Sequence, residues 1–321
     1  MIWGKFRKQR RIWIKMENKP IRVDVSEIKT YKSCRRQWLL TSRNRFHLRP
    51  IITPSHFALG TIFHESLHMM YMGASLEKTM EFVRNSMSTD SEVALLAMVP
   101  GYYKNVIPND LDRYQVLDIE HHFDFIPTDL DTGEVIDPEV HVCGSIDMIV
   151  LDPVENKIYG FEHKTCKNFR DSSFMWMDEQ PRVYTYALML YVRDYNEKRL
   201  AEGQPPVELG GIYINEVKKL LRDFKYQRTL CKYPKDDLRN FMRAFFGTCC
   251  ACHQSVMNND PAYPSPSYFG CSMCDYKTIC ETYMYSTLDK DEVIEEFKEE
   301  FKVRENDHLE EKTERSNESD K

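Results

Sequence analysis

The sequence predicts an α/β protein with one sheet-containing core and, beside it, a helical annex assembled from both ends of the chain. Its 321 residues, 42% of them apolar, can form one large core, or one core and a smaller lobe. Apolar residues recur at helical spacing up to about residue 106 and alternate as in strands from Tyr114. Cysteines occur near both ends, at Cys34 and in GCSMCDYKTIC, which indicates that the two ends meet.

The helical part comes first. A short helical region is expected in SEIKTYKSCRRQWLL, and a longer helix in ALGTIFHESLHMMYMG, which Gly73 ends. Residues 75–106 are also expected to be helical. Both stretches precede the first predicted strand, so helices should pack against a sheet that the chain forms later.

Three strands follow, in QVLDIEHHFDFIP, HVCGSIDMIVL and KIYGFEHKT, with turns in TDLDTGE and DPVENK. The segment MWMDEQPRVYTYALMLYVRDY is expected to be an amphipathic helix, and LGGIYINEV a further strand. Residues 235–257 form the next predicted helix. This order of strands and helices is typical of an α/β core.

The two ends of the chain differ in charge. Residues 1–49 contain 15 Lys and Arg against 3 Asp and Glu, whereas residues 289–321 contain 7 against 14. A basic arm favours contact with phosphates, although a poorly ordered terminus is the alternative. We expect a basic arm over residues 1–25, a folded domain over residues 26–288, and a largely disordered acidic tail over residues 289–321. One helix is expected in this tail, in DEVIEEFKEEFKV.

No apolar run is long enough to span a membrane, and MIWGKFRKQRRIWIKM lacks the apolar stretch and the cleavage site of a signal peptide. Ten cysteines without an export signal favour metal binding or buried thiols over disulfides. These observations predict a cytoplasmic protein that does not associate with membranes.

A pair of acidic residues with a lysine indicates a metal site. Glu162 and Lys164 share one face of a predicted strand, while His163 points away. The turn DPVENK makes a hairpin that can bring Asp147 next to Glu162. Such carboxylates suit Mg²⁺ or Mn²⁺, which would activate water beside Lys164. The alternative is that Asp147 is a turn residue and that the other two form an exposed pair.

Three features favour the metal site. Asp147 lies among apolar residues of its strand, where an unpaired carboxylate would cost several kcal/mol. Gln180 and Tyr184 are four residues apart and therefore share one face of the next predicted helix. His64, on an earlier predicted helix, offers a further ligand.

Six residues carry a resemblance to a known family, in this order: His64, Asp147, Glu162, Lys164, Gln180 and Tyr184. They resemble the motifs of the RecB-like branch of the PD-(D/E)xK nucleases. Its relatives with a four-cysteine iron–sulfur cluster include the AddB nuclease domain and the CRISPR-associated spacer-trimming exonucleases. The resemblance covers residues 26–280 and implies a restriction-endonuclease-like core, with a central mixed sheet flanked by helices. One departure is GSID, which lacks the proline that the family name places before the aspartate.

The resemblance also implies a role for each residue. The metal ligands would be His64, Asp147, Glu162 and the main-chain carbonyl of His163. Lys164 would be catalytic, while Gln180 and Tyr184 would orient the lysine or contact the DNA end. Glu120, in the strand before the hairpin, is a candidate acid that supports these ligands without binding the metal.

The cysteine pattern indicates a second metal centre. A C-x2-C pair with a third cysteine six residues on can bind one metal, and Cys34 must join it from 237 residues earlier. By resemblance to the iron–sulfur nucleases, a [4Fe–4S] cluster of structural role is implied on Cys34, Cys271, Cys274 and Cys280. The alternative is zinc, bound by the three C-terminal cysteines with Cys249, Cys252 or His253.

A competing motif lies in the helix of His64. The sequence His64-Glu65-Ser66-Leu67-His68 matches H-E-x-x-H, the signature of helical zinc metalloproteases, with Glu65 as the base. However, Tyr71 stands where the extended signature requires glycine, and no helix with a glutamate ligand follows. The motif is therefore a weaker prediction than the nuclease.

We therefore expect a metal-dependent DNA exonuclease of DNA recombination or repair, of phage or mobile-element type, that acts on DNA ends or single strands. A non-catalytic, metal-stabilised DNA-binding module is a further alternative, and a homo-oligomer or a recombination partner protein stays open. Five arginines are expected to line the DNA entrance, unless they are only solvent-exposed charges: Arg35, Arg36, Arg43, Arg45 and Arg49.

Overall fold

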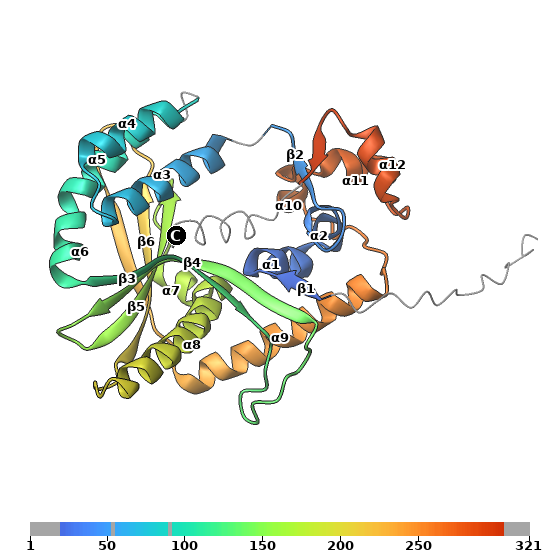
Figure 1. Ribbon diagram of the computed structural model, residues 1–321. Helices are drawn as coiled ribbons and strands as arrows, with labels where there is room; N and C mark the ends of the chain where they lie inside the picture. Colours follow the sequence, from blue (N-terminus) through green and yellow to red (C-terminus); the bar gives the residue numbers. More distant parts are fainter. Residues whose placement is uncertain (1–19, 53–54, 89–91, 305–321) are drawn as a thin grey trace, which may run out of the picture.

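A six-stranded mixed sheet forms the centre of the protein (Figure 1). The computed structural model describes residues 20–52, 55–88 and 92–304. The strand order is β1-β4-β5-β6-β7, and β3 also pairs with β4. The bounds are Ile21–Val23 (β1), Gln115–Phe125 (β3), Val140–Asp152 (β4), Lys157–Cys166 (β5), Glu208–Lys218 (β6) and Tyr226–Cys231 (β7).

Parallel and antiparallel pairs both occur in this sheet, as the mixed sheet of the prediction requires. β3 with β4, β4 with β5, and β6 with β7 are antiparallel, whereas β1 with β4 and β5 with β6 are parallel. Parallel neighbours need a long crossover. Between β5 and β6 this crossover is formed by α7 (Ser172–Met177) and α8 (Glu179–Ala201).

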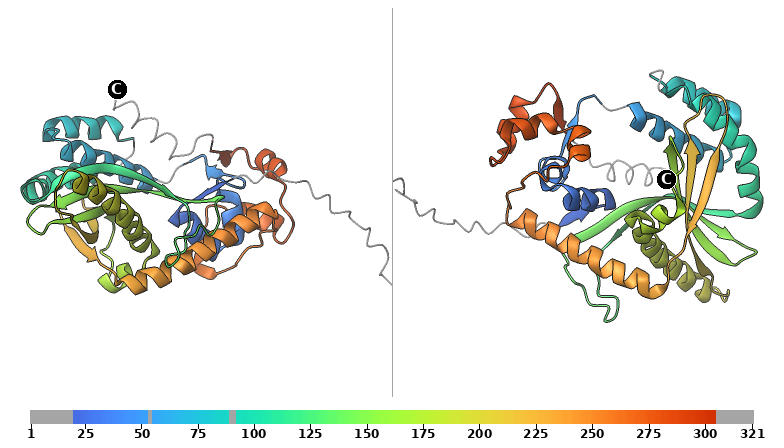
Figure 2. Two further views of the ribbon diagram at one scale, coloured as in Figure 1. Left: turned by 60° about the horizontal axis from the view of Figure 1, so that its bottom comes forward. Right: turned by 180° about the vertical axis from the view of Figure 1, so that it is seen from behind.

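Helices cover both faces of the sheet (Figures 1 and 2). One face packs against α1 (Val25–Ser33), α8 and α9 (Lys235–Met257), through a core cluster that includes Ile28, Val183 and Phe246. The other face packs against α3 (Ser55–Tyr71), α4 (Leu76–Ser86), α5 (Leu95–Asn105) and α6 (Ile107–Arg113). The apolar residues of α9 recur every three or four positions, so this helix buries one side only.

The two ends of the chain meet in a separate annex with its own core cluster. It comprises α2 (Arg35–Thr41), β2 (Leu48–Pro50), α10 (Tyr268–Ser272), α11 (Lys277–Tyr283), α12 (Lys290–Glu296) and β8 (Phe301–Val303). β2 pairs antiparallel with β8, and Leu40 and Ile279 are fully buried between the two segments. Figure 1 shows these N-terminal and C-terminal elements side by side. The predicted α/β core with an annex from both ends is therefore confirmed.

Both ends of the predicted domain need correction. Ile21–Val23, placed in a basic arm, is strand β1 of the central sheet, and residues 1–19 lie outside the described residues. The helix predicted in the acidic tail is present as α12, but Phe301–Val303 is a strand because Phe301 is buried against the Tyr276 ring. Residues 305–321 of that tail are not described.

Strands β2 and β7 were not predicted, because Leu48–Pro50 is short and the sequence of β7 has no clear alternation of apolar and polar residues. The stretch 75–106, predicted to be helical, contains the two helices α4 and α5. Within the described ranges, no helix has the length and apolar character that crossing a membrane requires.

Candidate active site and cysteine cavity

Asp147 of β4 is the centre of the candidate active site. The registers of β3 with β4 and of β4 with β5 place Glu120 of β3 on one side of it and Glu162 of β5 on the other. Directly opposed residues of antiparallel strands have Cβ atoms about 5 Å apart. Glu120 and Asp147 therefore approach one another, and Glu162 lies at the same level of the sheet on the other side of Asp147.

The strands are irregular at this level. Glu120 has a φ of 56°, in the left-handed region that non-glycine residues seldom adopt. In β4, Ile146 contributes to the core cluster under α8, but Met148 contributes to the cluster under α3. Residues two apart normally share a face, so the alternation breaks at Asp147. Strained backbone of this kind concentrates at functional sites.

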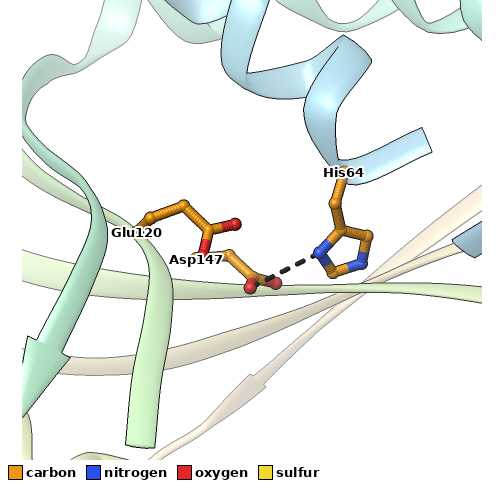
Figure 3. Close-up of side chains that lie close together, drawn as sticks. All are labelled: His64, Glu120 and Asp147. Carbon is orange, nitrogen blue, oxygen red and sulfur yellow. Dashed lines mark ion pairs between the residues drawn. The ribbon is translucent and has the colours of Figure 1, made fainter. Parts of the chain in front are cut away.

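His64 of α3 reaches Asp147 from the helical side, with its Nδ1 3.5 Å from the aspartate Oδ1 (Figure 3). His64, Glu120 and Asp147 offer ligand atoms that all lie within 4.8 Å of one another, and no other such group of His, Cys, Asp or Glu occurs among the described residues. All three are half-buried. Two carboxylates and an imidazole can bind a divalent cation such as Mn²⁺.

From the sequence, Glu120 was predicted to be a supporting acid that does not bind the metal. The structure places its carboxylate with the ligand group itself (Figure 3). The sequence contained a signal for this position, because Glu120 is an acidic residue within the predicted strand that precedes the strand of Asp147. Only the register of the folded sheet shows that the two residues are opposite one another.

Glu162 and Lys164 share one side of β5, as their spacing predicted, and form an ion pair. Gln180 Nε2 of α8 donates to Glu162 Oε1 at 2.9 Å, and the N-cap Asp178 fixes the start of that helix. Glu162 is only 3% exposed, and its Oε2 has no hydrogen-bond partner among the described residues. A buried carboxylate oxygen without a partner is costly, and a bound cation would satisfy it.

The pKa values of the ionisable groups in this site shift in different directions. Burial, reinforced by the charge of Asp147, raises the pKa of Glu162 to about 7. Burial also acts to raise the pKa of Asp147, but His64 and Lys164 outweigh it and hold this pKa below its usual range. The pKa values of His64 and Lys164 are raised, because the neighbouring carboxylates outweigh the effect of burial. Asp147 and the ammonium group of Lys164 are therefore charged at neutral pH.

His163 contributes its main chain to the site and its ring to the opposite side of β5. Its backbone N–H donates to Asp147 Oδ2 at 2.6 Å. Its ring Nδ1 lies 2.9 Å from Asn215 Nδ2, and the ring stacks on Tyr71. Burial lowers the pKa of His163 to about 3, so the ring is neutral and accepts from the amide. The role of its carbonyl as a metal ligand stays a prediction.

Tyr184 lies deeper in the protein, 9% exposed, with its ring edge-on to Phe123 at 5.5 Å. Burial raises the pKa of its hydroxyl well above the usual value, and a hydrogen bond with Gln180 opposes this shift. The structure thus brings Tyr184 to Gln180, and Gln180 to Glu162, which is the carboxylate that Lys164 also contacts.

The four cysteines of the predicted cluster line one cavity of about 240 Å³ in the annex: Cys34, Cys271, Cys274 and Cys280. A single water occupies about 30 Å³ of liquid, so a polyatomic group fits this cavity. Within the described part of the chain, no three of these thiols lie within 4.8 Å of one another. Zinc bonded to sulfur at about 2.3 Å would draw four thiolates to about 3.8 Å from each other. The cavity is wider than such a zinc site.

The prediction that Arg36 lines the DNA entrance is wrong, because this side chain is 1% exposed. Its Nε donates to the carbonyl of Ala262 at 2.7 Å, and its Nη2 donates to those of Met284 and Ser286 at 3.0 Å. Its buried Nη1 has no partner among the described residues. Arg36 therefore joins the two ends of the chain around the cysteine cavity.

Of the other four arginines, Arg43 and Arg45 are engaged within the fold, whereas Arg35 and Arg49 are exposed and their predicted role stays a prediction. Arg43 Nη2 donates to Asp24 at 2.9 Å, and Arg45 Nη1 donates to the carbonyl of Ser255 at 2.8 Å, so both join the annex to the core. Arg35 stacks on the ring of Tyr31. Arg49 is exposed on β2.

The alternative metal ligands are arranged differently. Cys249 and Cys252 are fully buried in the core cluster under α9, and His253 Nδ1 lies 2.8 Å from Asp137 Oδ2. In the H-E-x-x-H motif, Glu65 is exposed, and the ligand group of His64 does not include His68. His64 is directed at Asp147, a residue that the metalloprotease motif does not contain.

Comparison with known proteins agrees with this geometry. The sequence matches the family model of the PD-(D/E)XK nuclease superfamily over residues 22–281. A solved structure described as a putative exonuclease from Eubacterium rectale is 10% identical, covering 86% of this chain and 94% of that one, with a TM-score of 0.46. The structure of SSO0001 is 11% identical, covering 84% and 88%, with a TM-score of 0.34.

At TM-scores below 0.5, these two likenesses add nothing to the assignment. A comparison with curated proteins found no match. The family match extends over most of the chain and contains the candidate active site as well as all four cysteines of the cavity. This chain therefore belongs to the PD-(D/E)XK nuclease superfamily, whose members use divalent metals such as Mg²⁺ or Mn²⁺ to cleave DNA.

Proposed function

We propose that this nuclease is a metal-dependent exonuclease that hydrolyses phosphodiester bonds at DNA ends or in single strands during recombination or repair. The observation that carries the proposal is the meeting of His64, Glu120 and Asp147 in one ligand group, with Glu162 and Lys164 at the adjacent strand position. The step from nuclease to exonuclease is supported by the resemblance of the motifs and of the cysteine pattern to iron–sulfur exonucleases.

The donor set fits Mg²⁺ or Mn²⁺. The ion would be held by His64, Glu120, Asp147 and Glu162, whose Oε2 is buried without a partner among the described residues. When bound, the cation lowers the pKa of the attacking water and neutralises charge that develops on the phosphate. Metal binding requires Glu162 to lose its proton, since the pKa of this acid is about 7 in the free site.

Lys164 supplies a fixed positive charge. Glu162 and Asp147 raise the pKa of its ammonium group, so it stays protonated at neutral pH. A protonated lysine cannot accept a proton from water, but it can stabilise the additional charge on the phosphate in the transition state. Gln180 holds Glu162 from the other side, which keeps this carboxylate in place beside the ammonium group.

The cysteine cavity fits a [4Fe–4S] cluster better than zinc. All four predicted cysteines line it, and among the described residues no three of their sulfur atoms lie within 4.8 Å of one another, whereas zinc would bring all four to about 3.8 Å. Burial lowers the pKa of the Arg36 guanidinium, and the nearby Cys280 and Cys34 oppose this shift. Its Nη1 lacks a partner among the described residues. An anionic thiolate cluster would satisfy this buried positive charge. We propose that the cluster is structural and holds the two ends of the chain together.

The test is digestion of end-labelled linear single strands, linear duplexes and closed circles, with Mg²⁺ or Mn²⁺. We expect the linear substrates to be degraded from an end and the closed single-stranded and double-stranded circles to resist. Cleavage of closed circles at the rate of linear DNA would identify an endonuclease and contradict the proposal. For the cysteine site, anaerobically purified protein should be brown and contain about four iron atoms, whereas stoichiometric zinc in colourless protein would contradict the cluster.

A further inference from the structure

A group of basic residues lies at the edge of the sheet that follows Lys164. β5 and β6 are parallel neighbours, so their C-terminal ends meet there, and the N–H of Lys219 donates to the carbonyl of Cys166 at 2.8 Å. The segments 167–170 and 218–225 contain one acid, Asp223. They carry six cations, which we call the basic rim: Lys167, Arg170, Lys218, Lys219, Arg222 and Lys225.

The basic rim adjoins the candidate active site. Arg170 Nε pairs with the buried Glu216 Oε1 at 2.8 Å, and Glu216 is the register partner of Lys164 on β6. Lys164, Arg170 and Gln180 also line one small hollow. The charge of the chain as a whole is −6, so this density of cations is a local property of one edge.

Half of these cations are available to a ligand. Lys167, Arg222 and Lys225 are exposed, and none of the three forms an ion pair with another described residue. Unpaired cations in a row repel one another, and a phosphate backbone supplies the missing negative charge. The arginines that the sequence placed at the DNA entrance are engaged within the fold at Arg36, Arg43 and Arg45, so they do not offer this surface.

Helix α7, which lies between Arg170 and α8 in the chain, adds an apolar surface. Its Met175 is buried and lines the hollow beside Lys164, whereas Phe174, Trp176 and Met177 are 55%, 41% and 68% exposed. The Trp176 ring is held edge-on by Tyr233, with ring centroids 5.4 Å apart. Tyr233 follows Cys231, which pairs with Ile212 of β6, so Trp176 extends this apolar surface from the hollow toward the end of β6 opposite the rim. A basic surface continued by exposed aromatic rings is a combination that binds single-stranded nucleic acid, with phosphates on the cations and bases stacked on the rings.

We propose that the basic rim and the exposed face of α7 bind the unpaired DNA strand that enters the candidate active site, with phosphates on the rim and bases on Phe174 and Trp176. This inference rests on the proposed function and makes an unpaired strand the preferred substrate. Bases within a duplex are stacked on each other and cannot use these rings.

The charge contribution is tested by the variant Lys167→Ala/Arg222→Ala/Lys225→Ala. Binding of a fluorescent oligo(dT) is measured by anisotropy in EDTA, without cleavage, at several salt concentrations. Each phosphate contact to a single strand contributes about 0.7 to the slope of log K against log salt, so we expect the slope to fall by about 2. The control Lys78→Ala/Arg193→Ala/Lys198→Ala removes the same charge from exposed positions elsewhere and should leave the slope unchanged. An unchanged slope in the rim variant, or an equal fall in both, would overturn the proposal.

The stacking contribution is tested by Phe174→Ala, alone and with Trp176→Ala. A stacked base contributes about 1–3 kcal/mol, so each substitution should weaken oligo(dT) binding by about 5-fold or more, and blunt duplex binding much less. Leu200→Ala, at an apolar residue 59% exposed near the end of α8, is the control. Equal losses for single strand and duplex would overturn the assignment to an unpaired strand. The single Phe174 variant keeps the test valid if loss of Trp176 disturbs Tyr233.

The two proposals can fail separately. Rim-dependent binding without any DNA cleavage would refute the proposed function and support the binding surface. Cleavage of linear DNA by a protein whose binding slope is unchanged in the rim variant would refute the binding surface and leave the proposed function standing.

Discussion

Replacing Glu27 with glutamine tests how burial controls charge where the annex joins the core. Glu27 Oε1 accepts hydrogen bonds from Trp38 and Asn44, both at 3.2 Å, and from Ser42, while Arg43 Nε is 3.8 Å from Oε2. The side chain is 7% exposed. Burial is the largest influence on this acid, and it raises the pKa of Glu27 from 4.5 to about 7.

The sign of the effect on stability follows from this shift. Between pH 4.5 and about 7 the folded protein retains a proton that the unfolded chain has lost, so stability falls as pH rises through this range. Each pKa unit is worth about 1.4 kcal/mol, which gives a cost of about 3 kcal/mol above pH 7. Glutamine keeps the carbonyl acceptor and has no proton to lose. Glu27→Gln should therefore be neutral near pH 5 and stabilising by up to about 3 kcal/mol at pH 8.

The assay is urea unfolding at pH 5 and pH 8, followed by tryptophan fluorescence. Glu197→Gln, at an exposed position of α8, changes the formal charge equally and should shift stability by less than about 0.5 kcal/mol at both pH values. A destabilised Glu27→Gln protein at pH 8 would show that the pair with Arg43 outweighs desolvation. That result would refute the reasoning.

Three further predictions concern the metal sites. The cleavage rate should fall by at least about 100-fold, with little loss of DNA affinity, in each of the variants Asp147→Ala, Glu162→Ala and Lys164→Ala. Single-turnover digestion measures the rate, and fluorescence anisotropy measures the affinity. Wild-type activity in any of the three would contradict the mechanism. Glu120→Gln should weaken Mn²⁺ binding in calorimetry by at least about tenfold, the effect typical even of residues that only support ligands; unchanged affinity would remove Glu120 from the ligand set. Cys34→Ser should yield protein depleted in iron whose terminal segments are cut sooner by trypsin, because the cluster closes a long loop; equal iron content would exclude Cys34.

Features that depend on neighbours in the chain could be predicted from the sequence. Alternation along a strand put Glu162 and Lys164 on one side, and they form an ion pair. Helical spacing put Gln180 and Tyr184 on one face of α8, and both approach Glu162. The spacing of Cys271 and the two later cysteines indicated that they face one centre, and all of them line one cavity.

Features that depend on register and burial could not be predicted in this way. Glu120 and Asp147 are 27 positions apart, and only the pairing of β3 with β4 puts them opposite one another. Arg36 and Arg43 read as surface charges, yet the annex buries the first and pairs the second with Asp24. A basic sequence carries no information on whether its cations face solvent or backbone carbonyls.

By itself the sequence determined the residue types of the site, the order of helices and strands, and the need for the two ends to meet. The tertiary structure decided which acids lie beside Asp147. It also engaged Arg36, Arg43 and Arg45 within the fold, while Lys167, Arg222 and Lys225 at the edge of β5 and β6 stayed exposed. The physical reason is that periodicity is a local property, whereas a metal site and a binding surface form from contacts between distant segments, and those contacts exist only once the strands have paired in register.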